Sequence, residues 1–307
     1  MLFFKKDFEE NILQLLEYLA SEKYSHGEYE SFFVHDPKRR HIHKAQVADR
    51  VIHHAIHRIL EPIFDKTFIF DSYSSRKNKG THKAMARLND FAWKLSENNT
   101  KTVWILKCDI RKFFDSVDQE ILFNILGRKI TDERTLRLLG KIISSYNPET
   151  KRGIPLGNLT SQLFSNIYLN LLDQFVKRDL RVKHYIRYAD DFVFLSRDKK
   201  QLEEIIPIIR KFLKETLALE MHEDKLSLSK FHKGLDYLGF VHFPHFSVVR
   251  TKTKRRMFKK LNRKFKDLKS EKISSESFNQ TKQSYLGILS HSQNKGLIKI
   301  IKNKFPS

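Results

Sequence analysis

Three aspartates interrupt apolar stretches of a strongly basic chain. Asp109 ends the run TVWILKCD, and Asp190 and Asp191 separate the runs HYIRY and FVFLS about eighty residues later. An aspartate pair in a turn is usually solvated for local reasons, but an unpaired carboxylate beside apolar strands is costly. With a net charge of +22, this pattern favours a divalent-metal site for phosphoryl transfer on nucleic acid.

The charge balance indicates a polyanionic partner. Lys and Arg number 58 against 36 Asp and Glu, an excess that attracts nucleic acid. A membrane surface is the second candidate, but no apolar run reaches the roughly 18 residues of a spanning helix, and the N-terminus does not resemble a secretory signal. We therefore expect a cytoplasmic protein with no membrane partner. The single cysteine, Cys108, excludes an internal disulfide and a multi-cysteine zinc site.

Periodicity predicts a mixture of helices and short strands, and hence an α+β fold. We expect a turn at Asp36-Pro37 and a helix that stops at Pro62. The other predicted helices lie at 7–20, 82–96, within 111–129, after the loop GIPLGN in 153–179, and at 199–219. The predicted strands are 102–110, HYIRY, FVFLS and the run GLDYLGFVHF.

A basic amphipathic helix is predicted near the C-terminus. Twelve Lys or Arg lie between Arg250 and Lys272, against Asp267 and Glu271 alone. Apolar residues recur at helical spacing on one side of it, at Met257, Leu261, Phe265 and Leu268. We place a domain boundary near residue 248, with a small helical unit after it.

Pairs of histidines have the spacing of metal ligands without the partners. His41 with His43, and His53 with His57, are accompanied by no His-Glu-x-x-His motif or second cysteine. We expect them on helix faces or on a surface near RNA, where partial protonation near neutral pH makes binding pH-sensitive.

Five blocks follow one another within residues 36–243. They are DSYSSRKNKGTHKA, KCDIRKFFDSVD, GIPLGNLTSQLFSNIYLNLLD, YIRYADDFVFLS and GLDYLGF. These blocks and their order resemble those of reverse transcriptases. The variant LGNLTSQ, where intron-type and retroviral enzymes typically carry Gln-Gly and Ser-Pro, is most similar to the enzymes of diversity-generating retroelements. These enzymes copy a template RNA with errors at adenines.

The resemblance implies a right-hand polymerase of α+β class. Its fingers would lie in residues 1–100, its palm of antiparallel sheet and helices in 101–248, and its helical thumb in 249–307. The implied partners are template RNA, primer, their RNA–DNA heteroduplex and dNTPs, with a small basic accessory protein.

The resemblance also assigns roles to individual residues. Two Mg²⁺ ions, or Mn²⁺ as a substitute, would be held by Asp109, Asp190, Asp191 and the backbone of Ile110, since hard cations prefer oxygen ligands. The incoming nucleotide would be contacted by Arg76, Lys79, Ile110, Arg111, Lys112, Phe113, Phe114, Leu156 and Gly157. The thumb residues assigned to nucleic-acid binding are Lys254, Arg255, Arg256, Lys259, Lys260 and Arg263.

Two assignments carry specific expectations. Phe114 corresponds to the ring that excludes a ribose 2′-hydroxyl by shape, although the Phe113-Phe114 pair is also compatible with simple core packing. Leu156 replaces an amide that could hydrogen-bond the nascent pair, so we expect error-prone copying; the alternative is that Leu156 only packs under its loop.

Three other functions stay open. A defence-associated reverse transcriptase copying a non-coding RNA shares every motif, and an RNA-dependent RNA polymerase is disfavoured by Phe114. A non-catalytic RNA-binding scaffold would keep the basic surface without turnover.

Overall fold

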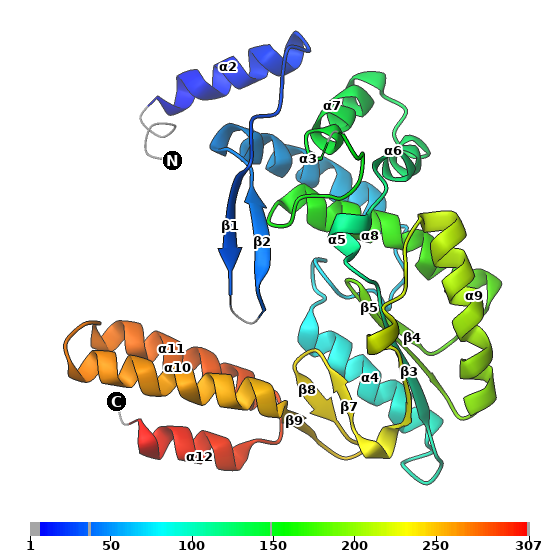
Figure 1. The fold of residues 1–307 in the computed structure, drawn as a ribbon, viewed down its shortest axis with the longest axis vertical. Coiled ribbons are helices and arrows are strands. Elements are labelled where there is room, and N and C mark those ends of the chain that lie inside the picture. The colour runs from blue at the N-terminus through cyan, green and yellow to red at the C-terminus, as the bar shows by residue number, and fades with distance from the viewer. Residues whose placement is uncertain (1–6, 36–37, 148, 306–307) are drawn as a thin grey trace. The chain divides into compact units, whose positions relative to one another are not determined.

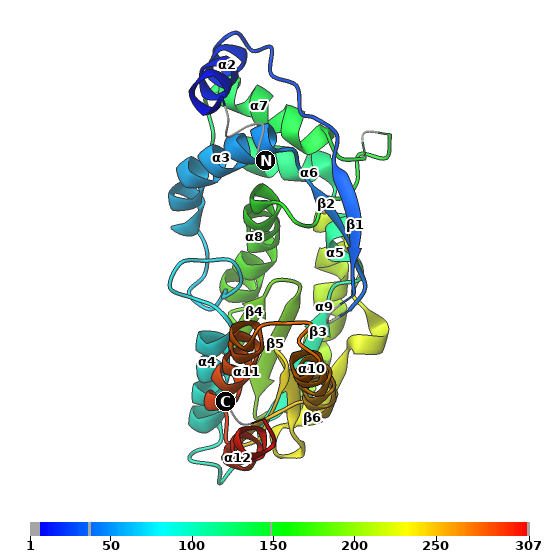
Figure 2. The ribbon, with the colours of Figure 1, turned by 90° about the vertical axis from the view of Figure 1, so that its left-hand side faces the viewer.

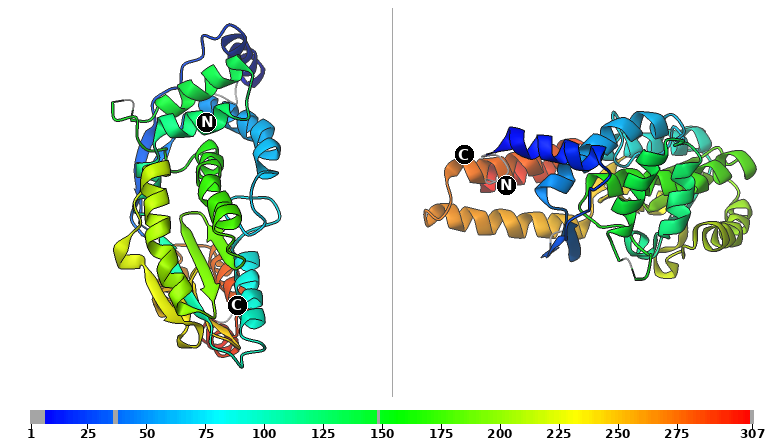
Figure 3. Two further views of the ribbon diagram at one scale, coloured as in Figure 1. Left: turned by 90° about the vertical axis from the view of Figure 1, so that its right-hand side faces the viewer. Right: turned by 90° about the horizontal axis from the view of Figure 1, so that it is seen from above.

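The described residues form two compact units that are interleaved along the chain. The structure, a computed structural model, describes residues 7–35, 38–147 and 149–305. The first unit comprises Met1–Gly80, Lys107–Phe194 and Glu203–Leu226, and the second comprises Thr81–Leu106, Leu195–Leu202 and Ser227–Ser307. Each unit is built from three separate segments of the chain. It therefore contains several of the colours that mark position along the sequence (Figure 1, Figure 2 and Figure 3).

About half of the first unit is helical. Its helices are α2 (Phe8–Ala20), α3 (Val47–Asp65), α5 (Phe113–Ser116), α6 (Gln119–Gly127), α7 (Glu133–Ser144), α8 (Leu159–Gln174) and most of α9 (Lys199–Leu217). A π-helix, Phe175–Asp179, continues α8, and a 3-10 turn covers Glu223–Lys225. Helix α8 packs against α3 and is buried along its length, although eight of its sixteen residues are polar.

Short strands form two hairpins in the described residues between 30 and 196, and the second hairpin belongs to a four-stranded sheet. A hairpin joins β1 (Glu30–Val34) to β2 (Arg40–Lys44), with Phe33 opposite His41. A second hairpin joins β4 (Tyr185–Tyr188) to β5 (Asp191–Ser196). The strand order of the sheet that contains the second hairpin is β4-β5-β3-β6, with β3 at Trp104–Asp109 and β6 at Ser227–Lys230.

The second unit combines a meander with four helices. Its elements are α4 (Thr81–Leu95), a 3-10 turn (Phe231–Lys233), β7 (Leu235–Tyr237), β8 (Phe240–His242), β9 (Ser247–Val249), α10 (Thr251–Lys269), α11 (Ser275–Ser290) and α12 (Lys295–Lys304). Their shared core contains Met85, Phe240, Met257, Leu261, Phe278, Leu289, Ile301 and Phe305. The mixture of helices with antiparallel strands in both units confirms the α+β class.

Most predicted elements are present. The predicted end of one helix differs from the structure, and one hairpin was not predicted. Helix α3 does not stop at Pro62 but continues to Asp65. Proline lacks an N–H, so Pro62 removes one helical hydrogen bond. The helix nevertheless continues for three more residues. The hairpin of β1 and β2 was not predicted, and its expected turn at Asp36-Pro37 lies outside the described residues.

Two buried side chains have shifted pKa values. Cys108 is 1% exposed in β3, and burial raises the pKa of its thiol. His53 lies on a buried face of α3, and its ring nitrogens contact Thr160 and His26. The pKa of His53 is lowered to about 4. Burial is the largest cause, and the charges of His26 and His54 contribute less. His53 is therefore neutral near pH 7 and contributes no charge to RNA binding.

A buried ion pair ties β4 to α8. The side chains of Arg187 and Asp173 are both fully buried, and Nη2 of Arg187 lies 2.7 Å from Oδ2 of Asp173. Arg187 Nε donates to Oδ1 of the same carboxylate at 2.8 Å, and the hydroxyl of Tyr185 donates to it at 2.9 Å. Burial beside this carboxylate raises the pKa of Tyr185.

The remaining Arg187 donors reach a second residue of α8 and two other segments. Nη1 donates to Oδ1 of Asn166 at 3.2 Å and to the carbonyl of Ala189 at 3.1 Å, and Nη2 donates to Oγ of Ser72 at 3.1 Å. A guanidinium has five N–H donors, so every one of them is used. The arrangement joins β4, α8 and the loop around Ser72, and it holds the residue that precedes Asp190.

We predict that Arg187→Met lowers the free energy of unfolding by about 3–5 kcal/mol, because loss of one partner leaves a buried charge uncompensated. Urea denaturation measures this difference. Arg178→Met, at an exposed position of the π-helix, is the control and should change stability by less than about 0.5 kcal/mol. A loss below about 1 kcal/mol for Arg187→Met would contradict the importance of this pair.

Candidate active site

The end of β3 is held by backbone hydrogen bonds on two sides. The amide of Ile110 donates to the carbonyl of Asp190 at 3.3 Å, so the residue after Asp109 touches the β4–β5 turn directly. On the other side, the amide of His222 donates to the carbonyl of Asp109 at 2.8 Å. The Asp109 backbone is therefore fixed between two segments that are distant in sequence.

The turn that carries the other two aspartates is a tight hairpin. Tyr188 and Asp191 form its last pair, which leaves only Ala189 and Asp190 in the loop. Ala189 has φ of 54°, in the left-handed region that two-residue hairpins require. Since Arg187 also binds the Ala189 carbonyl, the backbone of Asp190 is fixed next to that of Asp109.

The electrostatics show that the three carboxylates lie together. Burial raises the pKa of Asp190, and the negative charge of Asp109 raises it further, while Lys225 and Arg40 oppose the shift. Burial raises the pKa of Asp191 to about 6; Lys107 lowers it, and the charges of Asp109 and Asp190 raise it again. Asp109 itself is only 5% exposed. The structure thus brings together the three residues that the sequence singled out.

This acidic cluster suits a divalent cation with few protein ligands. In the described ranges, no group of three or more His, Cys, Asp or Glu is arranged so that it could hold a metal ion. Mg²⁺ does not need such a group, because it usually keeps several waters and adds substrate phosphates to one or two carboxylates. Buried carboxylates whose pKa values are raised by mutual repulsion are groups that a dication would stabilise. The chemistry of these carboxylates is therefore compatible with a divalent cation that takes only one or two protein ligands.

Two cations near the cluster were missed by sequence reasoning. Nζ of Lys225 lies 2.6 Å from Oδ1 of Asp109, and Arg40 on β2 is close enough to lower the pKa of Asp190. Lys225 follows α9 in a polar segment that carries no recognisable pattern. Arg40 lies in a hairpin whose exposed strands gave no periodic signal, so only the folded chain reveals either residue.

Arg76 is engaged within its own segment rather than directed at the aspartates. Its Nε and Nη2 bind the carboxylate of Asp65 at 2.6 and 3.2 Å, and Nη1 donates to the carbonyls of Ile69 and Ser72. The Arg76 side chain is 8% exposed. Lys79 Nζ donates to the carbonyl of Phe70 at 2.7 Å. This geometry gives Arg76 a structural role and does not support the predicted triphosphate contact.

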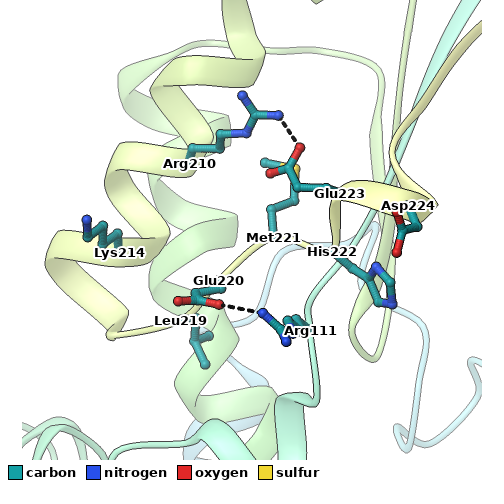
Figure 4. A pocket seen from close by; sticks show the side chains of 9 residues that line it. All are labelled: Arg111, Arg210, Lys214, Leu219, Glu220, Met221, His222, Glu223 and Asp224. Carbon is teal, nitrogen blue, oxygen red and sulfur yellow. Dashed lines mark hydrogen bonds and ion pairs between the residues drawn. The ribbon is translucent and has the colours of Figure 1, made fainter.

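Arg111 also points away from the cluster. Its Nη1 lies 3.3 Å from Oε2 of Glu220, at the edge of an open cavity of about 620 Å³. Figure 4 shows Arg111 directed toward Glu220 and Arg210 toward Glu223 on the walls of this cavity. The Arg111 side chain is therefore paired with Glu220 at an exposed position, and its contact with a nucleotide stays a prediction.

The two phenylalanines that follow have different environments. Phe113 is 2% exposed and belongs to the core, so the packing alternative holds for this ring. Phe114 is half-buried and packs edge-on against it, with ring centroids 5.5 Å apart. Lys112 is exposed and has φ of 44° at the start of α5. Phe114 is thus the ring of the pair that keeps a partly open surface.

The loop before α8 is docked on β2. The amide of His43 donates to the carbonyl of Leu156 at 2.9 Å, and the buried amide of Asn158 bridges the His43 carbonyl and the Ala45 N–H. Gly157 has φ of 120°, and a Cβ there would lie 2.7 Å from Cγ2 of Ile42. Glycine is required because β2 approaches this backbone, a contact different from the expected approach to a base pair. Leu156 stays half-buried above it.

The basic helix is present as α10 in the second unit. Met257 and Leu261 are buried in the helical core, and the predicted binding residues Lys254, Arg255, Lys259 and Arg263 are exposed, with Arg256 and Lys260 partly buried. The amphipathic prediction is confirmed. No helix in the described part of the chain is long and apolar enough to span a bilayer.

Comparison with known proteins places the chain among polymerases that use RNA. A family model described as reverse transcriptase (RNA-dependent DNA polymerase) matches residues 35–242. The protein YkfC of Escherichia coli K12 is 28% identical over 229 residues, which cover 62% of this chain and 60% of YkfC. The group II intron-encoded protein LtrA of Lactococcus lactis is 23% identical over 260 residues, covering 62% of this chain and 42% of LtrA. The chain matches less than two thirds of the length of each.

Solved structures with the same fold include two telomerases. Apo telomerase from Candida tropicalis aligns with a TM-score of 0.57 at 12% identity, over 86% of this chain and 57% of that one. Telomerase from Candida albicans in complex with a TWJ fragment of telomeric RNA gives 0.54 at 13% identity, over 83% of this chain and 54% of that one. These alignments confirm the expected right-hand polymerase fold.

We predict that Asp190→Asn weakens Mn²⁺ binding by about tenfold or more, because it removes a charged oxygen ligand. Titration followed by electron paramagnetic resonance of free Mn²⁺ measures the affinity. Asp179→Asn, an exposed acid in the π-helix, keeps the same change in net charge and should bind Mn²⁺ like the unchanged protein. Equal affinity of the two variants would remove Asp190 from the metal site.

Proposed function

Because the chain belongs to the reverse transcriptase family, we propose that it is an RNA-directed DNA polymerase that copies a template RNA into DNA from dNTPs. The observation that carries this proposal is the contact between the end of β3 and the β4–β5 turn, which gathers Asp109, Asp190 and Asp191. Phosphoryl transfer to a primer requires oxygen ligands converging at one point, and this chain provides them there.

Asp109 and Asp190 would hold the metal ions, with Asp191 and the Ile110 carbonyl as further ligands. Two Mg²⁺ ions, or Mn²⁺ in their place, would supply charge stabilisation at the attacking and leaving oxygens. Lys225, Arg40 and Lys107 are cations close to this cluster and would offset the negative charge of the triphosphate. Phe114 would close the site against a ribose 2′-hydroxyl.

The proposed division into fingers, palm and thumb follows the sequence boundaries 1–100, 101–248 and 249–307. The exposed cations of α10 would grip the primer–template heteroduplex through its phosphates, which gives sequence-independent binding. The telomerase from Candida albicans, which has the same fold, was solved in complex with a fragment of telomeric RNA. This supports RNA as a binding partner of the chain.

For the biological role we propose an error-prone enzyme of a diversity-generating retroelement, working with a dedicated RNA and a small basic accessory protein. The loop sequence LGNLTSQ and the apolar Leu156 support it. The alternative is a defence-associated reverse transcriptase that copies a non-coding RNA and shares these motifs. The surrounding genes separate the two, since only the first requires a repeat and a variable target gene nearby.

Primer extension on an RNA template tests the proposed activity. We expect the protein with Mg²⁺ to extend a DNA primer with dNTPs and to incorporate rNTPs at least about a hundredfold more slowly, because of Phe114. Asp190→Asn should abolish extension, while Asp179→Asn should retain it. RNA binding without extension in the unchanged protein would instead support the scaffold, and preference for rNTPs would support an RNA polymerase.

A second prediction concerns fidelity. We expect Leu156→Gln to lower misincorporation by about 5- to 100-fold, because an amide adds hydrogen bonds to correctly paired nucleotides of about 1–3 kcal/mol. Sequencing of cDNA copied from a defined template measures the error spectrum. Leu156→Met conserves size without adding an amide and serves as the control. An unchanged spectrum in Leu156→Gln would show that Leu156 only packs under its loop.

A further inference from the structure

The second unit contains an open cavity of about 470 Å³ that the proposed reaction does not use. It lies between α4, the turn from β8 to β9 and the turn from α11 to α12, all labelled in Figure 1. Its volume is within the range of small-ligand sites. None of its lining residues was singled out from the sequence, and none belongs to the aspartate cluster.

Large aromatic rings line this cavity while remaining exposed to water. Trp93 on α4 is 48% exposed, and Phe246 in the β8–β9 turn is 43% exposed. Phe246 stacks on Phe243, with ring centroids 4.8 Å apart and an interplanar angle of 27°. The Phe243 amide donates to the Phe246 carbonyl at 2.8 Å, which closes the turn. The Phe246 ring is therefore held in place with an open surface.

Polar groups with hydrogen-bonding edges lie beside these rings. Asn89 is on α4 one turn before Trp93, so both side chains project from the same face of the helix. Asn89 is exposed, and its amide makes no hydrogen bond within residues 7–35, 38–147 and 149–305. His291 also lines the cavity and stacks on His82 at 3.6 Å between ring centroids. Burial and the neighbouring His291 lower the pKa of His82.

The cavity walls are connected to each other by hydrogen bonds. The backbone amide of Gln293 donates to the carbonyl of Ser247 at 3.0 Å, and its side-chain amide donates to the carbonyl of His245 at 3.5 Å. These bonds join the α11–α12 turn to the β8–β9 turn. A preformed wall lowers the entropy cost of binding.

Flat aromatic faces combined with amide edges suit an unpaired nucleobase. Proteins recognise single-stranded RNA by stacking splayed bases on aromatic rings and hydrogen-bonding their edges. The acid on the rim, Asp90, lies 3.6 Å from Arg87 and 3.4 Å from Lys94, so its charge is compensated. The net charge of +22 disfavours a basic protein partner and favours a polyanion.

We propose that this cavity binds an unpaired base of single-stranded RNA, as an anchoring site separate from the aspartate cluster. The base would stack against Trp93 and Phe246 and present its edge to Asn89. Only the identity of the RNA depends on the proposed function, because we take it to be the enzyme's own template RNA. Binding itself requires neither metal nor nucleotide.

The first test measures affinity for a fluorescein-labelled 12-nucleotide single-stranded RNA without metal or dNTPs. We expect Trp93→Ala to weaken binding about tenfold, because a base–aromatic stack contributes a factor of that order. Trp93→Phe should restore most of it, and Asn89→Ala, at an exposed position, should weaken it several-fold. Tyr18→Ala removes a ring that is 42% exposed on α2 and is the matched control. A paired 12-base-pair RNA duplex should bind the Trp93→Ala variant and the unchanged protein equally.

The second test locates the RNA directly. Photo-crosslinking of the same oligonucleotide carrying 5-iodouridine, followed by mass spectrometry, should label Trp93 or Phe246. Two results would overturn the proposal. One is an affinity that stays within about twofold in both Trp93→Ala and Asn89→Ala, and the other is crosslinks confined to residues outside the cavity. Either result would leave a protein as the occupant. Because no catalysis is measured, failure of primer extension would not affect this result, nor would loss of this binding affect the assignment of the aspartates.

Discussion

The guanidinium of Arg187 places five N–H donors where water does not reach, and each of them has an acceptor. A buried charge is tolerated only when it is paired and fully hydrogen-bonded. Here the acceptors come from α8, the loop around Ser72 and the β4–β5 turn, so one side chain fixes three segments. The aspartate turn is therefore positioned by the same interaction that compensates a buried carboxylate.

The carboxylate cluster itself is not optimised for the stability of the metal-free chain. Burial and mutual repulsion raise the pKa values of Asp190 and Asp191, which means that their charged forms are disfavoured in place. Such local conflict is expected where a site must accept a ligand. The contact of Lys225 with Asp109 relieves part of the repulsion, and a bound dication would relieve it more completely.

Sequence reasoning succeeded where the pattern records burial. The helices 82–96 and 250–272 and the strands around the aspartates have clear periodicity, and they appear as α4, α10, β3, β4 and β5. It failed for β1 and β2, because every residue of β1 is exposed and no alternation marks the strand. No motif could reveal that Asp65, eleven residues before Arg76, binds its guanidinium.

The residue proposed to affect fidelity depends on that unpredicted hairpin. The carbonyl of Leu156 accepts a hydrogen bond from the backbone amide of His43. The side chain of Asn158 bridges the His43 carbonyl and the Ala45 N–H. Ile42 fills the space that a side chain at Gly157 would need. The same strand, β2, begins with Arg40, which acts on Asp190. Because one short strand joins the loop of Leu156 to a cation beside the aspartate cluster, a displacement of β2 would alter both. The proposed contact with the base pair would then change together with the proposed contact with the triphosphate.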